Sequence, residues 1–202
     1  MAANAFGFNG FTPVRHLSGG LIRANAFPIL TSGGTGFDDS IFSGDAVALN
    51  GDGSIELFAV GGGSESAPTL LGIFAGCTFT QASDNTIKYA PNWVASTAVV
   101  TGTTITAWVY DDPMTVFGVT TDATTAMTQS LTGLNADHVQ GTGSTYTGQS
   151  GSYLNVTTGI QTASAAFRIL RIVDMPGNTV GNTNCRVEVM CNEHVYRLGI
   201  GT

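Results

Sequence analysis

The chain has 202 residues, of which 43% are apolar and only 10% are charged, with a formal net charge of −7. This apolar content excludes a wholly disordered chain, and one lysine beside 27 glycines excludes long exposed helices, which favour Lys, Glu and Arg. Seven scattered basic residues are too few for nonspecific nucleic-acid binding, and the longest mainly apolar run, Leu70–Cys77, is too short for the roughly 20 residues of a membrane span.

Residues 1–37 differ from the rest of the chain in charge and pattern. They carry two arginines and no acid, whereas all 14 acidic residues lie from Asp38 onward. Glycine and proline interrupt every helical or strand pattern, and the first residues lack the basic start and apolar core of a secretion signal. The segment predicts an extended N-terminal arm that docks on a partner, or, alternatively, one that wraps its own body and adds an edge strand. The expected partner contacts are Phe6, Phe8, Phe11, Arg15 and Arg23.

The chain changes to β-type patterns from Ile41 onward. Ala46–Leu49 and Ile55–Val60 flank an Asn-Gly turn and predict a β-hairpin. Thr103–Tyr110 alternates apolar and polar residues, and the Asp-Asp-Pro turn after it is expected to return the chain as a strand over Met114–Thr120. The further expected strands are Leu70–Thr80, Ser152–Val156, Ala166–Val173 and Arg186–Cys191.

One helix is predicted, over Asp122–Leu131, with Asp122 as its N-cap and Ala123, Ala126 and Met127 on one side. About eight short strands with one short helix predict an all-β fold, either a β-barrel or a β-sandwich. No linker divides the chain after the arm, so residues 38–202 are expected to form a single β-rich domain.

The segment around Asn50 matches the middle of a calcium-binding EF-hand loop through Asn50, Asp52 and Gly53. The first and last ligand positions of that loop would fall on Ala48 and Ala59, whose side chains cannot coordinate calcium. A hairpin turn is therefore the better interpretation.

The Gly148–Gly151 segment resembles the nucleophile elbow of serine hydrolases, with Ser150 in the place of the nucleophile. That motif needs a glycine two residues after the serine, and Ser152 stands there. No glycine-rich segment continues into a phosphate-binding motif, so the sequence predicts no cofactor. A serine hydrolase would need one of the three histidines as its base: His16, His138 or His194.

Cys185, Cys191 and His194 could be imagined as zinc ligands. Structural zinc sites bring two ligands together on a short knuckle, whereas these cysteines stand six residues apart on an expected strand. They share one face with Val187 and Val189, while Arg186 and Glu188 share the other, so buried small side chains are the preferred interpretation. Three cysteines are an odd set, which favours free thiols and synthesis in a reducing cytoplasm.

Asp111 and Asp112 could form a catalytic pair of carboxylates. Adjacent strand residues point in opposite directions, and Pro113 follows, so turn formation accounts for the pair more simply. Asp38 and Asp39 have the same simple interpretation as solvated loop carboxylates.

Five features follow one another along the chain: Gly10–Gly20, Ile41–Val47, Gly72–Phe79, Trp93 and Ala107–Pro113. In this order and spacing they resemble small virion proteins of tailed bacteriophages that decorate or cement the capsid. The resemblance covers most of residues 7–120 and is weaker over Gly141–Thr162, and Asn192–His194 is a further trace near the C-terminus.

This resemblance implies a structural virion protein that binds the outside of a bacteriophage capsid and stabilises it, with no catalytic residues. The implied partner is the major capsid protein, and the expected homo-oligomer is a trimer, with a dimer as the alternative. No nucleic-acid or membrane partner is expected.

Two other function classes remain open from the residues alone. One is a receptor- or carbohydrate-binding β-module, in which Trp93, Trp108 or Tyr110 would stack on sugar. An exposed aromatic platform would favour this class. The other is a small hydrolase.

Overall fold

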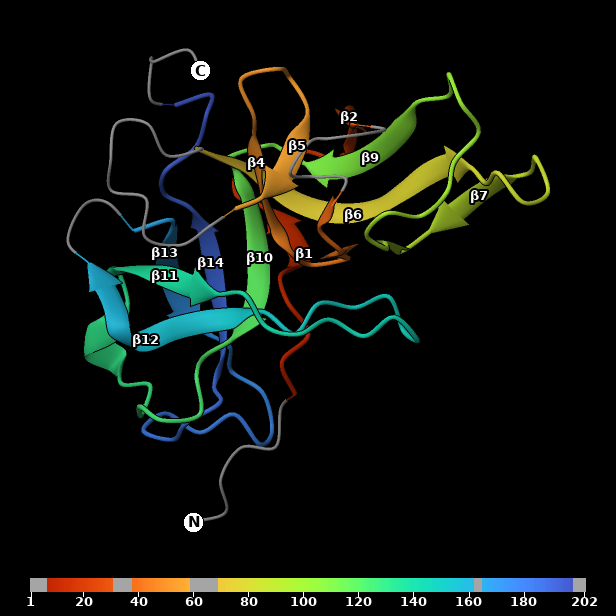
Figure 1. Cartoon of the computed structure of the whole chain (residues 1–202). Helices are drawn as coiled ribbons and strands as arrows, with labels where there is room; N and C mark the ends of the chain where they lie inside the picture. The colour runs from red at the N-terminus through yellow and green to blue at the C-terminus, as the bar shows by residue number, and fades with distance from the viewer. Residues whose placement is uncertain (1–6, 31–37, 59–68, 162–164, 198–202) are drawn as a thin grey trace.

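The computed structural model describes residues 7–30, 38–58, 69–161 and 165–197, which fold into an all-β arrangement with one 3-10 turn at Gln129–Leu131 (Figure 1). The prediction of an all-β fold is confirmed. The described residues contain fourteen strands where the sequence predicted about eight, because several are two to five residues long and carry little alternation of their own.

Six antiparallel strands form one large sheet, sheet A. Its order is β1-β10-β14-β13-β11-β12, so strands from the two ends of the chain lie close together. The strands of sheet A are β1 (Thr12–His16), β10 (Thr115–Thr120), β14 (Arg186–Cys191), β13 (Phe167–Ile172), β11 (Asn135–Val139) and β12 (Tyr153–Gln161).

The second large sheet, sheet B, has the order β2-β9-β6-β4-β5, and β7 also pairs with β6. A small third sheet joins β3 (Ile41–Phe42) to β8 (Asn92–Trp93). The strands of sheet B are β2 (Asn25–Ile29), β9 (Ile105–Tyr110), β6 (Leu70–Thr80), β4 (Ala46–Leu49), β5 (Ile55–Leu57) and β7 (Ile87–Ala90).

Two apolar cores flank sheet B, which explains why most of β6 is buried on both faces. The first core lies between the two large sheets and joins Ile73 of sheet B to Phe117 and Val189 of sheet A. The second core covers the opposite face of sheet B and contains Phe74 and the fully buried Trp93. The arrangement is sandwich-like, and half of sheet B extends beyond sheet A (to the right in Figure 1).

Several predicted strands are confirmed. The hairpin joins β4 to β5 with Val47 opposite Leu57, and β6 and β14 have the predicted bounds. In β9, Ile105, Ala107 and Val109 share one buried face, as alternation requires. Cys185, Val187, Val189 and Cys191 are buried together in the first core.

Two local predictions are wrong. Strand β10 does not pair with β9, because the turn after Tyr110 carries the chain from sheet B into sheet A. The segment Asp122–Leu131 is no α-helix; Asp122 accepts hydrogen bonds from the N–H groups of Thr124 and Thr125, as a cap would, but only the 3-10 turn follows. The three threonines between that cap and the turn have weak helix preference, and the Met127 N–H bonds instead to the Asn182 carbonyl.

The N-terminal segment is part of both sheets in its described residues, 7–30. β1 is an edge strand of sheet A and β2 an edge strand of sheet B. Pro13 and Pro28 lie within these strands, which suits edges, since proline cannot donate a hydrogen bond to a second neighbour. In these residues the segment therefore adds edge strands to its own body, which was the alternative expectation, and it does not form a separate docking arm. Residues 1–6 and 31–37 lie outside the described residues.

No helix in the described residues is long and apolar enough to cross a membrane.

Candidate functional site

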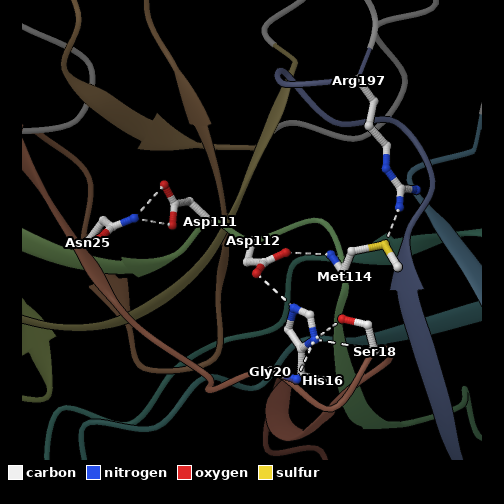
Figure 2. A network of polar contacts seen from close by, with 8 residues as sticks. All are labelled: His16, Ser18, Gly20, Asn25, Asp111, Asp112, Met114 and Arg197. Carbon is white, nitrogen blue, oxygen red and sulfur yellow. Dashed lines mark hydrogen bonds and ion pairs between the residues drawn. The ribbon is translucent and has the colours of Figure 1, made fainter.

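His16 lies at the centre of a polar network that joins the end of β1 to the turn between β9 and β10 (Figure 2). Its Nε2 atom is 2.9 Å from the Asp112 carboxylate, and its Nδ1 atom is 3.0 Å from the Ser18 hydroxyl. The backbone N–H groups of Ser18 and Gly20 also donate to Nδ1. Burial raises the pKa of Asp112, but hydrogen bonds from the Met114 N–H and from His16 outweigh it, so the pKa lies below its ordinary value.

Serine, histidine and aspartate are the residue types of a hydrolase triad, yet the proton positions here indicate a structural role. Nδ1 accepts from two backbone N–H groups, so it carries the lone pair, and Nε2 carries the proton donated to Asp112. A base that activated Ser18 would take up a proton at an atom that already faces two N–H donors. The network therefore holds the β1–β2 loop against the β9–β10 turn.

Asp111 and Asp112 do not converge on a common point. Figure 2 shows the Asp111 carboxylate turned toward Asn25, whose amide donates to it at 2.8 Å, while Asp112 faces His16. The Tyr196 hydroxyl also donates to Asp111, at 3.0 Å. Each carboxylate ties a different segment to the turn, so the pair lacks the shared geometry of two catalytic acids.

Ser150 donates its hydroxyl proton to Asp45, a fully buried carboxylate. Asp45 also accepts from the Ser152 hydroxyl at 3.0 Å and from the Phe42 N–H at 2.8 Å. Burial raises the pKa of Asp45, and these hydrogen bonds offset part of that effect. The nucleophile-elbow candidate is thus bound to an aspartate rather than to any of the three histidines, and it joins the Gly148–Gly151 segment to the β3–β4 turn.

His138 lies in an aromatic cluster with Phe11, Phe58 and Phe167, where its ring stacks on Phe58 with centroids 5.6 Å apart. Neither ring nitrogen has a hydrogen-bond partner among the described residues. Burial lowers the pKa of His138 to about 4, so the ring is neutral at pH 7. His194 is also buried, with its pKa lowered by burial.

The metal candidates Cys185 and Cys191 are buried in the first core, and Cys185 Sγ contacts the carbonyl oxygens of Thr179 and Asn182. Burial raises the pKa of Cys191 to about 12, which opposes the thiolate that a metal requires. Across residues 7–30, 38–58, 69–161 and 165–197, no three His, Cys, Asp or Glu side chains cluster as metal ligands would. Asp52 caps the β4–β5 loop by accepting from Ser54.

The residues predicted to contact a partner differ in burial and in their contacts within the chain. Phe11 is only 2% exposed and stacks on Phe167 with centroids 4.3 Å apart, so it anchors the first core and cannot anchor a partner. Phe8 is half-buried and stacks on Tyr153. Arg23 is exposed, and Phe6 lies outside the described residues. Arg15 is bound within the chain, to Glu188.

Arg15 belongs to a cluster of four arginines on the outer face of sheet A, named here the arginine face. The register places Glu188 opposite both Gly118 and Arg171, on the face away from the first core. Glu188 accepts from Arg15 at 2.9 Å and from Arg171 at 2.6 Å, and these bonds, with that of Arg171 the stronger, hold its pKa below the ordinary value. The arginine face comprises Arg15, Arg168, Arg171 and Arg186.

Sequence analysis missed this cluster, although the outward position of Arg186 and Glu188 was the signal that could have found it. Arg15 stands 153 residues or more before the other three arginines, and only the pairing of β1 with β10 brings them to one sheet. Arg168 donates to the side chains of Asn135 and Asn192, while Arg186 is half-buried, and burial lowers its pKa.

Replacing the shared carboxylate tests whether it holds β1 in place. Glu188→Ala is expected to lower the free energy of unfolding by about 1–3 kcal/mol, because three charge-assisted hydrogen bonds are lost while the arginines can become hydrated. Urea denaturation measures the change. Asp84→Ala, which breaks the exposed Asp84–Lys88 pair, is the control and should change stability little. Equal midpoints for Glu188→Ala and the wild type would contradict this role.

The three aromatic residues considered for sugar stacking differ in their exposure to solvent. Trp93 is fully buried, and Tyr110 packs against the first core. Trp108 is 41% exposed on sheet B. One of the three candidates therefore faces solvent.

No protein-family model, curated protein or solved structure matches the chain.

Proposed function

We propose that the protein is a structural virion protein that binds the outside of a bacteriophage capsid and stabilises it as a decoration or cement protein. The observation that carries the proposal is the arginine face. Four of the seven basic residues of a chain with net charge −7 lie on one face of sheet A, where Glu188 binds two of them. Such a face suits attachment to an acidic surface, which would repel the rest of the molecule.

The ordered resemblance to phage decoration proteins supports the same proposal. The polar networks add to it, because those around His16, Asp111 and Asp45 each connect separate segments of the fold. A protein of this class needs stiffness and a surface for attachment rather than a reaction site.

Stabilisation of the capsid follows from binding to the assembled shell and not to free subunits. At a hundredfold excess over the dissociation constant, each site adds ~2.7 kcal/mol to the stability of the bound state. Many sites on one shell make the effect cumulative. The proposed partner is the major capsid protein, and the proposed assembly is a trimer, with a dimer as the alternative; sedimentation of the free protein distinguishes them.

The proposal predicts that capsids lacking the protein survive heat and osmotic shock less well than capsids to which it has been added back. The measurement is the fraction of shells that remain intact after each treatment. Equal survival with and without the protein would refute the cementing function.

A charge variant tests the attachment face. Arg168→Ser/Arg171→Ser removes two exposed cations of the arginine face and is expected to weaken capsid binding at least tenfold and to reduce its dependence on salt. Lys88→Ser is the control, since Lys88 is a cation on β7 of sheet B, outside this face. If both variants bind as the wild type does, another surface makes the contact.

A further inference from the structure

A second surface, on the half of sheet B that sheet A leaves uncovered, carries no charged side chain. Residues directly opposite one another on neighbouring strands share a face, so the register defines the set. Trp108 lies opposite both Ala26 and Gly76, and Thr78 lies opposite both Thr106 and Tyr89. The surface, named here the uncharged face, comprises Ala26, Pro28, Thr78, Thr80, Ile87, Tyr89, Thr106 and Trp108.

This face is open because sheet A covers only the other half of sheet B. Ile73 and Tyr110, at that covered half, belong to or pack against the first core. Figure 1 shows β7 and the adjoining parts of β6 and β9 extending away from the strands of sheet A. The opposite side of the same strands is closed by the second core, which includes Cys77 and Ala107.

Two aromatic side chains dominate the uncharged face. Tyr89 is 79% exposed and Trp108 is 41% exposed. The Trp108 indole N–H donates to the Thr78 hydroxyl at 3.2 Å, which orients the ring on the sheet. Tyr89 and Trp108 lie on the strands that flank β6, opposite Thr78 and Gly76, so two strand spacings and a two-residue offset put their backbones roughly 12 Å apart. That separation is comparable with the length of a disaccharide unit.

The chemistry of the face points to an uncharged ligand with both apolar and hydroxyl surfaces. Lys88, the nearest cation on β7, lies opposite Phe79 on the other side of the sheet and pairs with Asp84. No residue of the uncharged face therefore attracts or repels a charged ligand, while aromatic rings accept the C–H face of a pyranose ring and threonine hydroxyls bond its O–H groups.

We propose that the uncharged face binds a neutral polysaccharide chain. One sugar unit stacks on Trp108 and another on Tyr89, and the chain crosses β6 between them above Thr78. Strand backbone beneath the aromatic side chains keeps the platform rigid, so little ordering cost accompanies binding. The site is separate from the arginine face and does not depend on capsid attachment.

Titration of the free protein tests the proposal. The ligands are cellohexaose, chitohexaose and maltohexaose, and binding is followed by calorimetry and tryptophan fluorescence. The chain has two tryptophans, and Trp93 is buried, so a ligand-induced change in emission reports on Trp108. At least one of these neutral probes is expected to bind and shift the emission. If none binds at millimolar concentration, the proposal is overturned.

Substitutions locate the binding. Trp108→Ala and Tyr89→Ala are each expected to weaken binding of that probe about tenfold, as followed by calorimetry. Tyr146→Ala is the matched control, because Tyr146 is 98% exposed on the loop between β11 and β12, outside the uncharged face. Unchanged affinity in the first two variants would overturn the proposal. So would sedimentation showing a wild-type oligomer that Trp108→Ala dissociates, since the face would then bind a second copy of the chain.

Discussion

Deletion of residues 1–24 is expected to unfold the protein rather than to release an independent body. The deletion removes β1 from the edge of sheet A and Phe11 from the first core. It also breaks the ion pair of Arg15 with Glu188 and the contact of His16 with Asp112. Circular dichroism and thermal melting of the truncated chain measure the effect.

Phe11→Ala isolates the apolar part of this effect. Loss of a fully buried phenylalanine is expected to lower the free energy of unfolding by about 3–5 kcal/mol, a large share of the 5–15 kcal/mol typical of a domain. The control is Leu21→Ala in the same segment, because Leu21 is largely exposed and should change stability little. A truncated chain that melts normally would restore the interpretation of this segment as a separate docking arm.

Acid is expected to destabilise the protein through His138 well before most carboxylates become protonated. In the unfolded chain the histidine binds a proton below its ordinary pKa of 6.5, whereas burial lowers the pKa in the folded chain to about 4. The unfolded state therefore binds more protons between these values. The full stability is present above pH 6.5, and about 3 kcal/mol is lost by pH 4.

His138→Phe tests this expectation, because phenylalanine suits the surrounding cluster of Phe11, Phe58 and Phe167 and cannot bind a proton. The variant should lose less stability than the wild type between pH 6.5 and 4 in urea denaturation. His194 also has a lowered pKa and contributes to both proteins, so the difference between the two pH profiles isolates His138. Parallel profiles would show that His138 is not the group responsible.

The strands that the sequence predicted correctly are those with a complete local signal. In β9, buried aliphatic residues alternate with more exposed residues over the whole length, and β6 is a mainly apolar run. The β4–β5 hairpin has turn residues that favour reversal of the chain. Alternation and turn preference act between neighbours in sequence, so one chain suffices to recognise them.

The partners of those strands were decided by the tertiary structure. Local pattern predicted a return strand after Asp111–Pro113, but the return strand β10 belongs to the other sheet. The Asp122–Leu131 segment has a helix cap and an apolar spacing, yet the Met127 N–H finds its partner on the loop before β14. Contacts with distant segments outweighed weak local preferences in both cases.

The N-terminal segment and the two candidate surfaces show most clearly which features a local sequence pattern predicts and which depend on strand pairing. Composition alone identified residues 1–37 as an extended segment rich in Phe and Leu, with two arginines and no acid, but gave no means to tell a partner from the chain's own sheets. Arg15 and Arg171 come to one surface, as Tyr89 and Trp108 do, only through strand pairing. Strand pairing depends on the simultaneous burial of both cores, which are built from residues distant in sequence. No local pattern therefore determines which strands pair at their edges.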